Sequence, residues 1–295
     1  MSPPRPRDDR VLPVTRCAAL IVFFILVPAS TILWVAPDRT ADLWAWMIKP
    51  ELTPIFLGSG YGAGAYFFWR TYRAERWHPS SPGVLGASIF AGLMLIATGI
   101  HWDRFNHGDA PALAAIAFYA WTIVYIVSPF AVFAIWWRNR STDPRTAAAD
   151  EPRVPRGALF AARVFATGAL AAGALAFAVP QVAIDVWPWQ LTPLTARVLA
   201  SLTMQVGVGA FVLSRDPRWS AWRLIAQTFL VATALLLTGA IRAFADFDTS
   251  NPLTWLYLGG LTGTAGALIV LIRSTARNGV GPIHQGGSRW PSPVS

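Results

Sequence analysis

One sequence pattern occurs twice in the chain, as Pro37-x4-Asp42-Leu43-Trp44-Ala45-Trp46 and as Pro180-x4-Asp185-Val186-Trp187-Pro188-Trp189. The matched proline, aspartate and two tryptophans are each 143 positions apart, which is about half of the 295-residue chain. A constant offset of that size predicts an internal duplication, and a duplication constrains the architecture before any single helix is considered.

The composition is typical of a membrane protein. The chain is 54% hydrophobic and only 13% charged, with a mean hydropathy of +0.44, whereas soluble domains are about 25% charged. The strict alternation expected of transmembrane β-strands is absent from the sequence. Eight apolar stretches are close to the roughly 20 residues that a helix needs to cross a bilayer: 17–36, 52–69, 83–101, 112–137, 158–179, 193–213, 221–241 and 252–272. We therefore predict an all-α membrane protein with eight transmembrane helices.

The polar segment 138–157 divides the chain into two halves. We predict a first repeat at 17–137 and a second at 158–272, each with four helices, joined by this linker. Residues 1–16 and 273–295 are rich in Pro, Gly, Ser and Arg, and we expect them to be disordered tails.

Shorter matches between the halves keep the same order. Leu52-Thr53-Pro54 parallels Leu191-Thr192-Pro193, and Thr98-Gly99 parallels Thr238-Gly239. An even number of spans per half means that both halves enter the membrane from the same side. The predicted fold is therefore two parallel four-helix repeats related by a pseudo-twofold axis along the membrane normal.

The charges predict an orientation and a location. With the N-terminus in the cytoplasm, 19 of the 24 Lys and Arg residues fall on the cytoplasmic side, and eight of the 15 acidic residues fall on the outer side. This asymmetry predicts that both termini are cytoplasmic, and it explains the net charge of +9 without a nucleic-acid partner. Fourteen of the fifteen tryptophans lie near predicted span ends, as interfacial belts require. A single Lys among so many Arg residues indicates a GC-rich bacterial genome, hence a bacterial plasma (inner) membrane.

The predicted spans contain few polar groups. No Asp, Glu, Lys or His lies near the centre of a span, and Gln205 and Gln227 are the main polar residues at mid-depth. This argues against a proton-coupled pump, which needs ionisable groups in the membrane. Gly58, Gly60, Gly62 and Gly64 form two overlapping G-xxx-G pairs, and Gly259 with Gly263 forms a third, which favours close helix packing over a substrate path.

Ionisable and aromatic residues gather at the predicted outer ends of the helices. In one interpretation, each repeated Asp caps a short interfacial helix that the tryptophans anchor. In another, these residues line a pocket that binds a cationic or amphiphilic ligand, or the arginines pair with the acids or bind a phosphate. The candidate binding residues are Asp42, Trp44, Trp46, His101, Asp103, Arg104, Asp185, Trp187, Trp189, Arg197, Arg242 and Asp246.

No motif of a known catalytic or nucleotide-binding site occurs in the sequence. His101, Asp103 and His107 have the chemistry of zinc ligands, but the second half keeps only the acid, in Ile241–Asp246. We therefore expect no metal and no cofactor, and we assign no catalytic residue.

A non-catalytic binding or accessory subunit is the favoured function. Its outer mouth would recognise a lipid-like or amphiphilic molecule, and its partners would be membrane lipids and another membrane protein or a second copy, not nucleic acid. One alternative is a transporter of a small neutral or amphiphilic solute, which polar side chains through the bundle would favour. Another is an enzyme acting on a lipid-linked substrate, with His101, Asp103 and Asp246 as acid or base.

Overall fold

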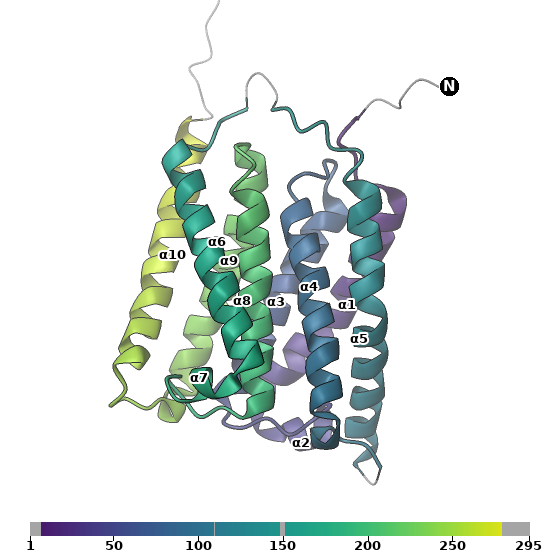
Figure 1. Cartoon of the computed structure of the whole chain (residues 1–295), viewed down its shortest axis with the longest axis vertical. Coiled ribbons are helices and arrows are strands. Elements are labelled where there is room, and N and C mark those ends of the chain that lie inside the picture. The colour runs from purple at the N-terminus through teal and green to yellow at the C-terminus, as the bar shows by residue number, and fades with distance from the viewer. Residues whose placement is uncertain (1–6, 109, 148–150, 279–295) are drawn as a thin grey trace, which may run out of the picture.

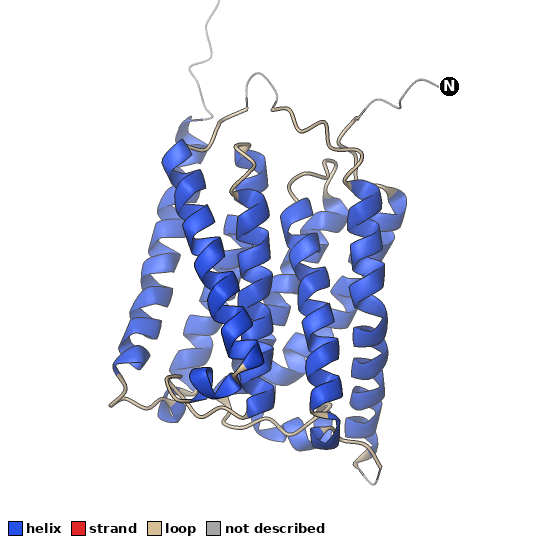
Figure 2. Ribbon diagram, in the orientation of Figure 1, coloured by secondary structure: helices blue, strands red, loops and turns tan. Residues whose placement is uncertain are grey.

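The computed structural model describes residues 7–108, 110–147 and 151–278, and its side chains as far as Arg273. The regular structure of these residues is a bundle of helices (Figures 1 and 2). Within the described ranges there is no strand, and extended pairing is limited to two isolated bridges, Arg10 with Arg76 and Arg153 with Arg218. The all-α class predicted from the sequence is confirmed.

Long and short helices follow a similar order in the two halves of the chain. Short helices α2 (Thr40–Leu43) and α7 (Pro180–Ile184) follow the first long helix of each half, and 3₁₀ turns at Trp102–Arg104 and Phe244–Asp246 follow the third. The long helices are α1 (Pro13–Val35), α3 (Leu52–Arg73), α4 (Ser81–Ile100), α5 (Ala112–Asn139), α6 (Arg156–Ala178), α8 (Pro193–Leu213), α9 (Trp219–Arg242) and α10 (Pro252–Asn278).

Seven of these helices, all except α3, are long and apolar enough to cross a membrane, which indicates a multi-pass membrane protein. Helix α3 is less apolar because it carries four glycines and ends in Arg70 and Arg73. Thirteen of its 22 residues are buried, so it lies mostly against other helices. A helix in that position needs small residues for close packing rather than an apolar surface for lipid.

The long helices form two layers of four. One layer, in front in Figure 1, runs α6, α8, α4, α5, and the other runs α10, α9, α3, α1. Neighbours within a layer pack closely, and α3 with α8 and α1 with α5 make contacts between the layers. Each layer contains two helices from each half of the chain, and the two helices of one half are neighbours in both layers, so the halves lie side by side.

Helix α1 packs closely against α3 at two glycines. A Cβ atom on Gly58 would lie 3.1 Å from the backbone N of Trp34 and 3.2 Å from the carbonyl O of Ser30. The Ser30 hydroxyl donates to the Gly58 carbonyl at 2.8 Å, and it would lie 2.9 Å from a Cβ on Gly62. The predicted G-xxx-G packing is therefore confirmed for Gly58 and Gly62. In α10, by contrast, Gly259 and Gly263 face open space.

The upper end of the bundle in Figure 1 holds residues 7–12 and the connecting residues 74–80, 140–147, 151–155 and 214–218. Val11 is 4% exposed, its N–H donates to the Glu75 carbonyl at 3.2 Å, and Asp9 N–H donates to the Thr142 carbonyl at 2.8 Å. The disordered tail predicted at 1–16 is therefore wrong for residues 7–16, because they bury an apolar side chain and satisfy their backbone groups. Residues 1–6 and 279–295 lie outside the described part of the chain.

The contact at Gly58 yields a first prediction. Substituting Gly58→Val should lower the free energy of unfolding by about 1–3 kcal/mol, because the new side chain meets backbone atoms that cannot move aside. The matched control is Gly263→Val in α10, where nothing lies within 4 Å of a new Cβ. Unfolding in mixed micelles, titrated with a denaturing detergent and followed by circular dichroism, measures both. Equal effects of the two substitutions would contradict the close α1–α3 contact.

Candidate functional site

The repeated tryptophans lie in aromatic clusters at the lower end of the bundle. Trp44 and Trp46 are 7% and 3% exposed. The Trp46 ring centroid is 4.8 Å from that of Trp121 and 5.2 Å from that of Phe105. The interpretation of these two residues as lipid-facing anchors is therefore wrong, since their rings fill the space between α3, α4 and α5.

The second copy of the pattern builds a similar cluster. Trp189 is 3% exposed, and its ring lies 5.6 Å from Phe247, 5.5 Å from Tyr257 and 5.1 Å from Trp187. The Trp189 indole N–H donates to the Thr53 hydroxyl of α3 at 2.9 Å. The lower end is therefore closed by two packed aromatic clusters, one in each half of the chain.

The repeated aspartates lie apart from these rings, at the surface. Asp42 is exposed within α2, whose N-terminus has no side-chain cap. Asp185 follows α7, is exposed, and accepts a hydrogen bond from Gln181 Nε2 at 2.5 Å. The predicted capping role is wrong for both, because each Asp lies at the end of its short helix and not before it.

Other predicted site residues hold helix ends together. The Asp246 carboxylate accepts from the Leu52 N–H at 2.8 Å and so satisfies a backbone donor at the start of α3. Arg242 donates to the carbonyls of Trp34 and Val35 at the end of α1. Asp103 and Arg104 are exposed on the turn after α4.

His101 and Arg197 form a contact between α4 and α8. Arg197 Nη1 lies 2.8 Å from His101 Nε2, and the buried Arg197 Nε has no hydrogen-bond partner among the residues that the structure describes. Burial lowers the pKa of His101 below 6.5, and the positive charges of Arg197 and Arg104 lower it further. The neutral ring therefore accepts from Arg197 through Nε2, which leaves that lone pair unavailable to a metal. Among the described residues no group of three His, Cys, Asp or Glu could hold a metal.

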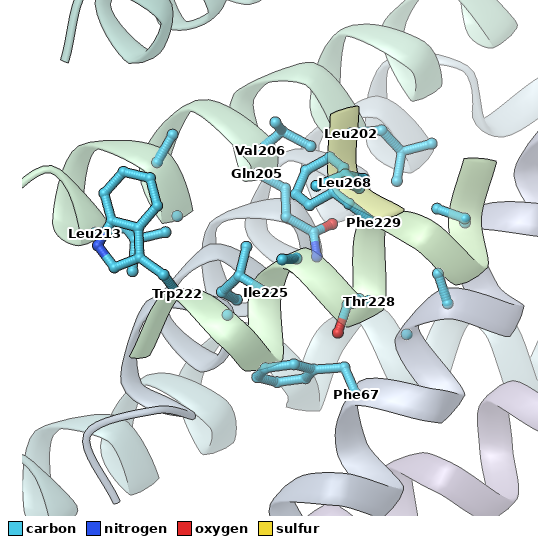
Figure 3. Close-up of a pocket in the computed structure, with 18 of the residues that line it drawn as sticks. Phe67, Leu202, Gln205, Val206, Leu213, Trp222, Ile225, Thr228, Phe229 and Leu268 are labelled. Atoms are coloured by element: carbon cyan, nitrogen blue, oxygen red, sulfur yellow. The ribbon is translucent and has the colours of Figure 1, made fainter. Parts of the chain in front are cut away.

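An apolar cavity lies between the two helix layers. It has a volume of about 350 Å³ and is lined by side chains of α3, α6, α8, α9 and α10 together with Gly83 at the start of α4 (Figure 3). Phe67, Leu202, Val206, Ile225 and Phe229 form much of its wall. No Asp, Glu, Lys, Arg or His is among the described residues that line it.

Gln205 supplies the main polar group of this cavity. Figure 3 shows its amide between the apolar side chains, near Phe229 and Leu202. Within the described part of the chain its side chain makes no hydrogen bond, whereas the Thr228 hydroxyl donates to the Leu224 carbonyl of its own helix. An amide without a partner in an apolar space is costly, and a ligand with a polar group would satisfy it.

A second, smaller cavity lies on the other side of Gln205. It has a volume of about 90 Å³ and is lined by α1, α3, α4, α5 and α8. The two cavities share Gly60, Gly64, Phe68, Leu202 and Gln205. The second glycine pair of α3 therefore faces the cavities, while Gly58 and Gly62 face α1 and α9.

A chain of polar side chains joins four segments at the upper end. His78 Nδ1 lies 2.5 Å from Asp9 Oδ2, and His78 Nε2 lies 2.6 Å from the Ser220 hydroxyl. This is the order of a Ser-His-Asp triad, but the Ser220 hydroxyl donates to the Glu151 carboxylate, which also accepts from the Ser220 N–H. The Ser220 hydroxyl proton is bonded to Glu151, so it is not placed for transfer to His78. The role of the cluster is to hold the four chain segments together.

Arg218 fastens the same end through two carboxylates. Its guanidinium donates to Asp143 at 2.8 and 3.0 Å and to Asp216 at 2.6 Å, and Arg218 is only 5% exposed. Burial alone would raise the pKa of Asp143, but hydrogen bonds from Arg218 and the Arg145 N–H lower it below its ordinary value. The predicted linker 138–157 is thus partly ordered, since Asp143 is held against the start of α9.

Comparisons with known proteins give no family for the chain. No family model matches it, and no curated protein and no solved structure is significantly similar to it. The site must therefore be judged from its own geometry.

Only some of the groups that the fold brings together can be recognised from the sequence. Gln205 was visible as one of two polar residues at mid-depth, but nothing indicated that a cavity surrounds it. The cluster of Asp9, His78, Glu151 and Ser220 spans 211 positions, so no local spacing could reveal it. Of the predicted outer residues, His101 and Arg197 are joined by a side-chain hydrogen bond across the two halves.

The lowered pKa of His101 yields a second prediction. Between pH 6.5 and the lower pKa of His101 in the folded protein, the unfolded chain binds a proton at His101 that the folded chain does not bind. The contribution of neutral His101 to the free energy of unfolding is therefore fully present above pH 6.5 and is lost as the pH falls through the folded pKa. His101→Gln should remove this part of the pH dependence, whereas His107→Gln, at an exposed position, should retain it. Unfolding midpoints measured across the acidic range test this, and identical pH profiles for the wild type and His101→Gln would contradict it.

Proposed function

We propose that the protein is a membrane-embedded binding protein for an apolar or amphiphilic molecule, which occupies the cavity around Gln205. The observation that carries this proposal is the combination of about 350 Å³ of apolar space with one unpaired amide. Ligand sites have volumes of about 300–1,000 Å³ and combine mainly apolar walls with a few polar groups that orient the ligand.

The chemistry of the walls supports an apolar occupant. Water enters a cavity only where it finds several polar partners, and apolar cavities remain dry or take up apolar molecules. Here Gln205 is surrounded by aromatic and aliphatic side chains. An acyl chain or a flat apolar molecule would contact the walls, and a carbonyl or hydroxyl group on it would pair with the amide.

The arrangement of the outermost helices supports entry from the bilayer. Helices α1 and α5 touch each other and close the smaller cavity, whereas α6 and α10 are not a closely packed pair in the described part of the chain. Both α6 and α10 nevertheless line the larger cavity, through Phe165 and Leu268 among others. The ligand would therefore enter sideways, between α6 and α10.

Binding is better supported than transport or catalysis. A transport path needs to reach both ends of the bundle, but the aromatic clusters around Trp46 and Trp189 fill the lower end. An acid–base pair of His101 and Asp103 would need their side chains to meet, but the contact of His101 is with Arg197. The cavity walls offer hydrophobic contact and one amide, which is the chemistry of a binding site.

The lower end is proposed as a contact surface for membrane lipids, another membrane protein or a second copy. Its carboxylates at Asp42, Asp103 and Asp185 are exposed. The open glycines of α10, Gly259 and Gly263, would allow close approach of a further helix. In this proposal the aromatic clusters at the lower end stabilise the conformation of this surface, and its exposed carboxylates contact the lipid or protein partner.

We also propose that all eight long helices span the membrane, as two parallel repeats. With α1, α3, α4 and α5 matched to α6, α8, α9 and α10, every closely packed neighbouring pair has an equivalent. The pair α1–α3 corresponds to α6–α8, α4–α5 to α9–α10, and α4–α8 to α9–α3. A pseudo-twofold axis between the two layers would produce this correspondence. In this proposal α3 also spans the membrane, because the axis makes it equivalent to α8, which is apolar enough to span.

Matched hydrogen bonds support the same axis. Asn106 Nδ2 donates to the Trp44 carbonyl at 2.9 Å, and Asn251 Nδ2 donates to the Trp187 carbonyl at 3.3 Å. His78 and Ser220 are 142 positions apart, and so are the acids Asp9 and Glu151 that accept from their backbone N–H groups. Because His78 and Ser220 also touch each other, the proposed axis would pass through their contact.

The upper end is proposed to face the cytoplasm of a bacterial cell. Arginines gather there, at positions such as Arg76, Arg138, Arg153 and Arg215, and acids are more frequent at the lower end. The positive-inside rule then places the N-terminus inside and the protein in the plasma membrane.

Filling the cavity tests the binding function. Ala162→Phe places a ring in the cavity and should weaken binding of a dansyl-labelled fatty acid at least about fivefold, because overpacking costs about 1–3 kcal/mol. The matched control is Ala161→Phe, since Ala161 is the exposed neighbour on α6 and does not line the cavity. Fluorescence titration in micelles measures both variants, and equal affinities would contradict the proposal.

Gln205→Leu tests the polar contact in the same assay. Loss of one hydrogen bond should weaken a labelled fatty acid about two- to tenfold. Binding of a labelled alkane without a polar group should not weaken, because the substitution makes the cavity wall more apolar. If both ligands lose affinity equally, Gln205 shapes the cavity and does not bond to the ligand.

Labelling of single cysteines tests the proposed orientation. In a chain with the exposed Cys17 replaced by Ser, a cysteine at Arg145 should resist a membrane-impermeant maleimide in intact cells. A cysteine at Thr249, on the opposite end of the bundle, should be labelled. Both should react after the cells are opened, and the reverse pattern in intact cells would place the N-terminus outside.

A further inference from the structure

A basic cleft lies at the upper end of the bundle, between α3 and α9. It has a volume of about 650 Å³ and is bounded by the last turn of α3, the connection to α4 and the first turns of α9. Arg70, Arg73, Arg76 and Arg223 line it, with Glu75 as its one acidic residue among the described lining residues. The cleft lies on faces of α3 and α9 that do not line the apolar cavity, so the two sites share no residue.

The four guanidinium groups lack carboxylate partners in the described part of the chain. The ion pairs found there involve Arg10, His78 and Arg218. All four arginines of the cleft are exposed, whereas Arg218, the paired arginine nearby, is buried. Four like charges around one hollow repel one another, and an anion in the hollow would relieve that repulsion.

Part of the cleft is held in position before any ligand binds. Arg70 Nη1 donates to the Tyr66 hydroxyl at 2.8 Å and to Gln227 Oε1 at 3.1 Å, which ties α3 to α9. The Tyr66 hydroxyl is itself 3.3 Å from Gln227 Oε1. These bonds use one nitrogen of Arg70, and the planar guanidinium keeps further donors for two oxygens of a phosphate.

The depth of the cleft matches the headgroup layer of a bilayer. Trp69, 37% exposed, lies beside it at the end of α3, and the Arg73 guanidinium lies 6.0 Å from the centroid of its ring. Exposed tryptophans at helix ends mark the boundary between hydrocarbon and headgroups. Towards the membrane centre the cleft is followed by the apolar turns of α9, against which acyl chains would lie.

We infer that this cleft binds the phosphate headgroup of an anionic phospholipid. The charge, the fork-shaped donors and the depth all fit a phosphodiester that is anchored by its acyl chains at the membrane surface. Basic pockets between helices at the membrane surface select anionic over zwitterionic lipids, because a choline or ethanolamine group would add a positive charge among the arginines. This site is independent of the apolar ligand proposed for the cavity.

Native mass spectrometry of the detergent-purified full chain tests the inference. The protein is incubated with phosphatidylglycerol or with phosphatidylcholine, and the bound lipid is counted. The wild type should retain phosphatidylglycerol in preference to phosphatidylcholine. The variant with Arg70, Arg73, Arg76 and Arg223 all replaced by Gln should lose this preference, with affinity falling about fivefold for each guanidinium removed.

The matched control removes the same charge elsewhere at the upper end. Arg138, Arg153, Arg156 and Arg215 are exposed and lie outside the cleft, and their replacement by Gln should leave phosphatidylglycerol binding unchanged. Equal losses in both quadruple variants would show attraction by net charge alone and would overturn the site. Displacement of phosphatidylglycerol by millimolar inorganic phosphate would also overturn it, because it would identify a site for the free anion.

Two further measurements separate this result from folding and from the cavity. Arg223→Gln alone, in α9, changes no hydrogen bond described above, and should weaken phosphatidylglycerol about fivefold with an unchanged unfolding midpoint. Ala162→Phe, which fills the cavity, should retain full phosphatidylglycerol binding. If Ala162→Phe abolishes that binding, the lipid occupies the cavity and the inference about the cleft is wrong.

Discussion

The close contact between α1 and α3 is the constraint on which the rest of the structure depends. Glycines recur at every second position of α3 from Gly58 to Gly64, so their pairs point in different directions around the helix. Gly58 and Gly62 let α1 and α9 approach, and Gly60 and Gly64 line the two cavities between the layers. The same helix therefore holds its own layer together and keeps the space between the layers partly empty.

The two ends of the bundle are stabilised by different interactions. At the lower end, rings around Trp46 and Trp189 fill the space between helices, and backbone groups are satisfied by Asn106, Asn251 and Asp246. At the upper end, ion pairs and hydrogen bonds hold the chain segments together: Arg218 bridges Asp143 and Asp216, and His78 bridges Asp9 and Ser220. The cavity lies between these two ends, and α6 and α10, the outermost helices on that side of the two layers, both line it.

This distribution has a consequence for ligand access. Helices α6 and α10 each pack against a single long helix of their own layer, α8 and α9 respectively. Small movements of either helix would widen the route from the bilayer without disturbing the aromatic clusters or the charged clamps. In the proposed function, the ligand would enter the cavity at this edge of the bundle.

The sequence by itself determined the class of the fold and the positions of its helices. Helices and closed barrels are the structures that satisfy all their backbone groups in a membrane without water, and apolar runs of about 20 residues without strand alternation therefore predict helices. The duplicated Trp pattern likewise indicated two similar lower-end structures, which the structure shows as two aromatic clusters. These features follow from local composition and spacing, which can be read directly along a chain.

Only the tertiary structure decided which way each side chain faces. Trp46 and Asp42 are four positions apart, yet one ring is buried and one carboxylate is exposed, because neighbouring helices cover one side of the segment. The cavity, the Asp9–His78–Ser220 cluster and the arginine cleft each unite residues from distant parts of the chain. Their positions depend on how the helices of the two halves pack against one another. A linear pattern indicates the helices but not which helices become neighbours.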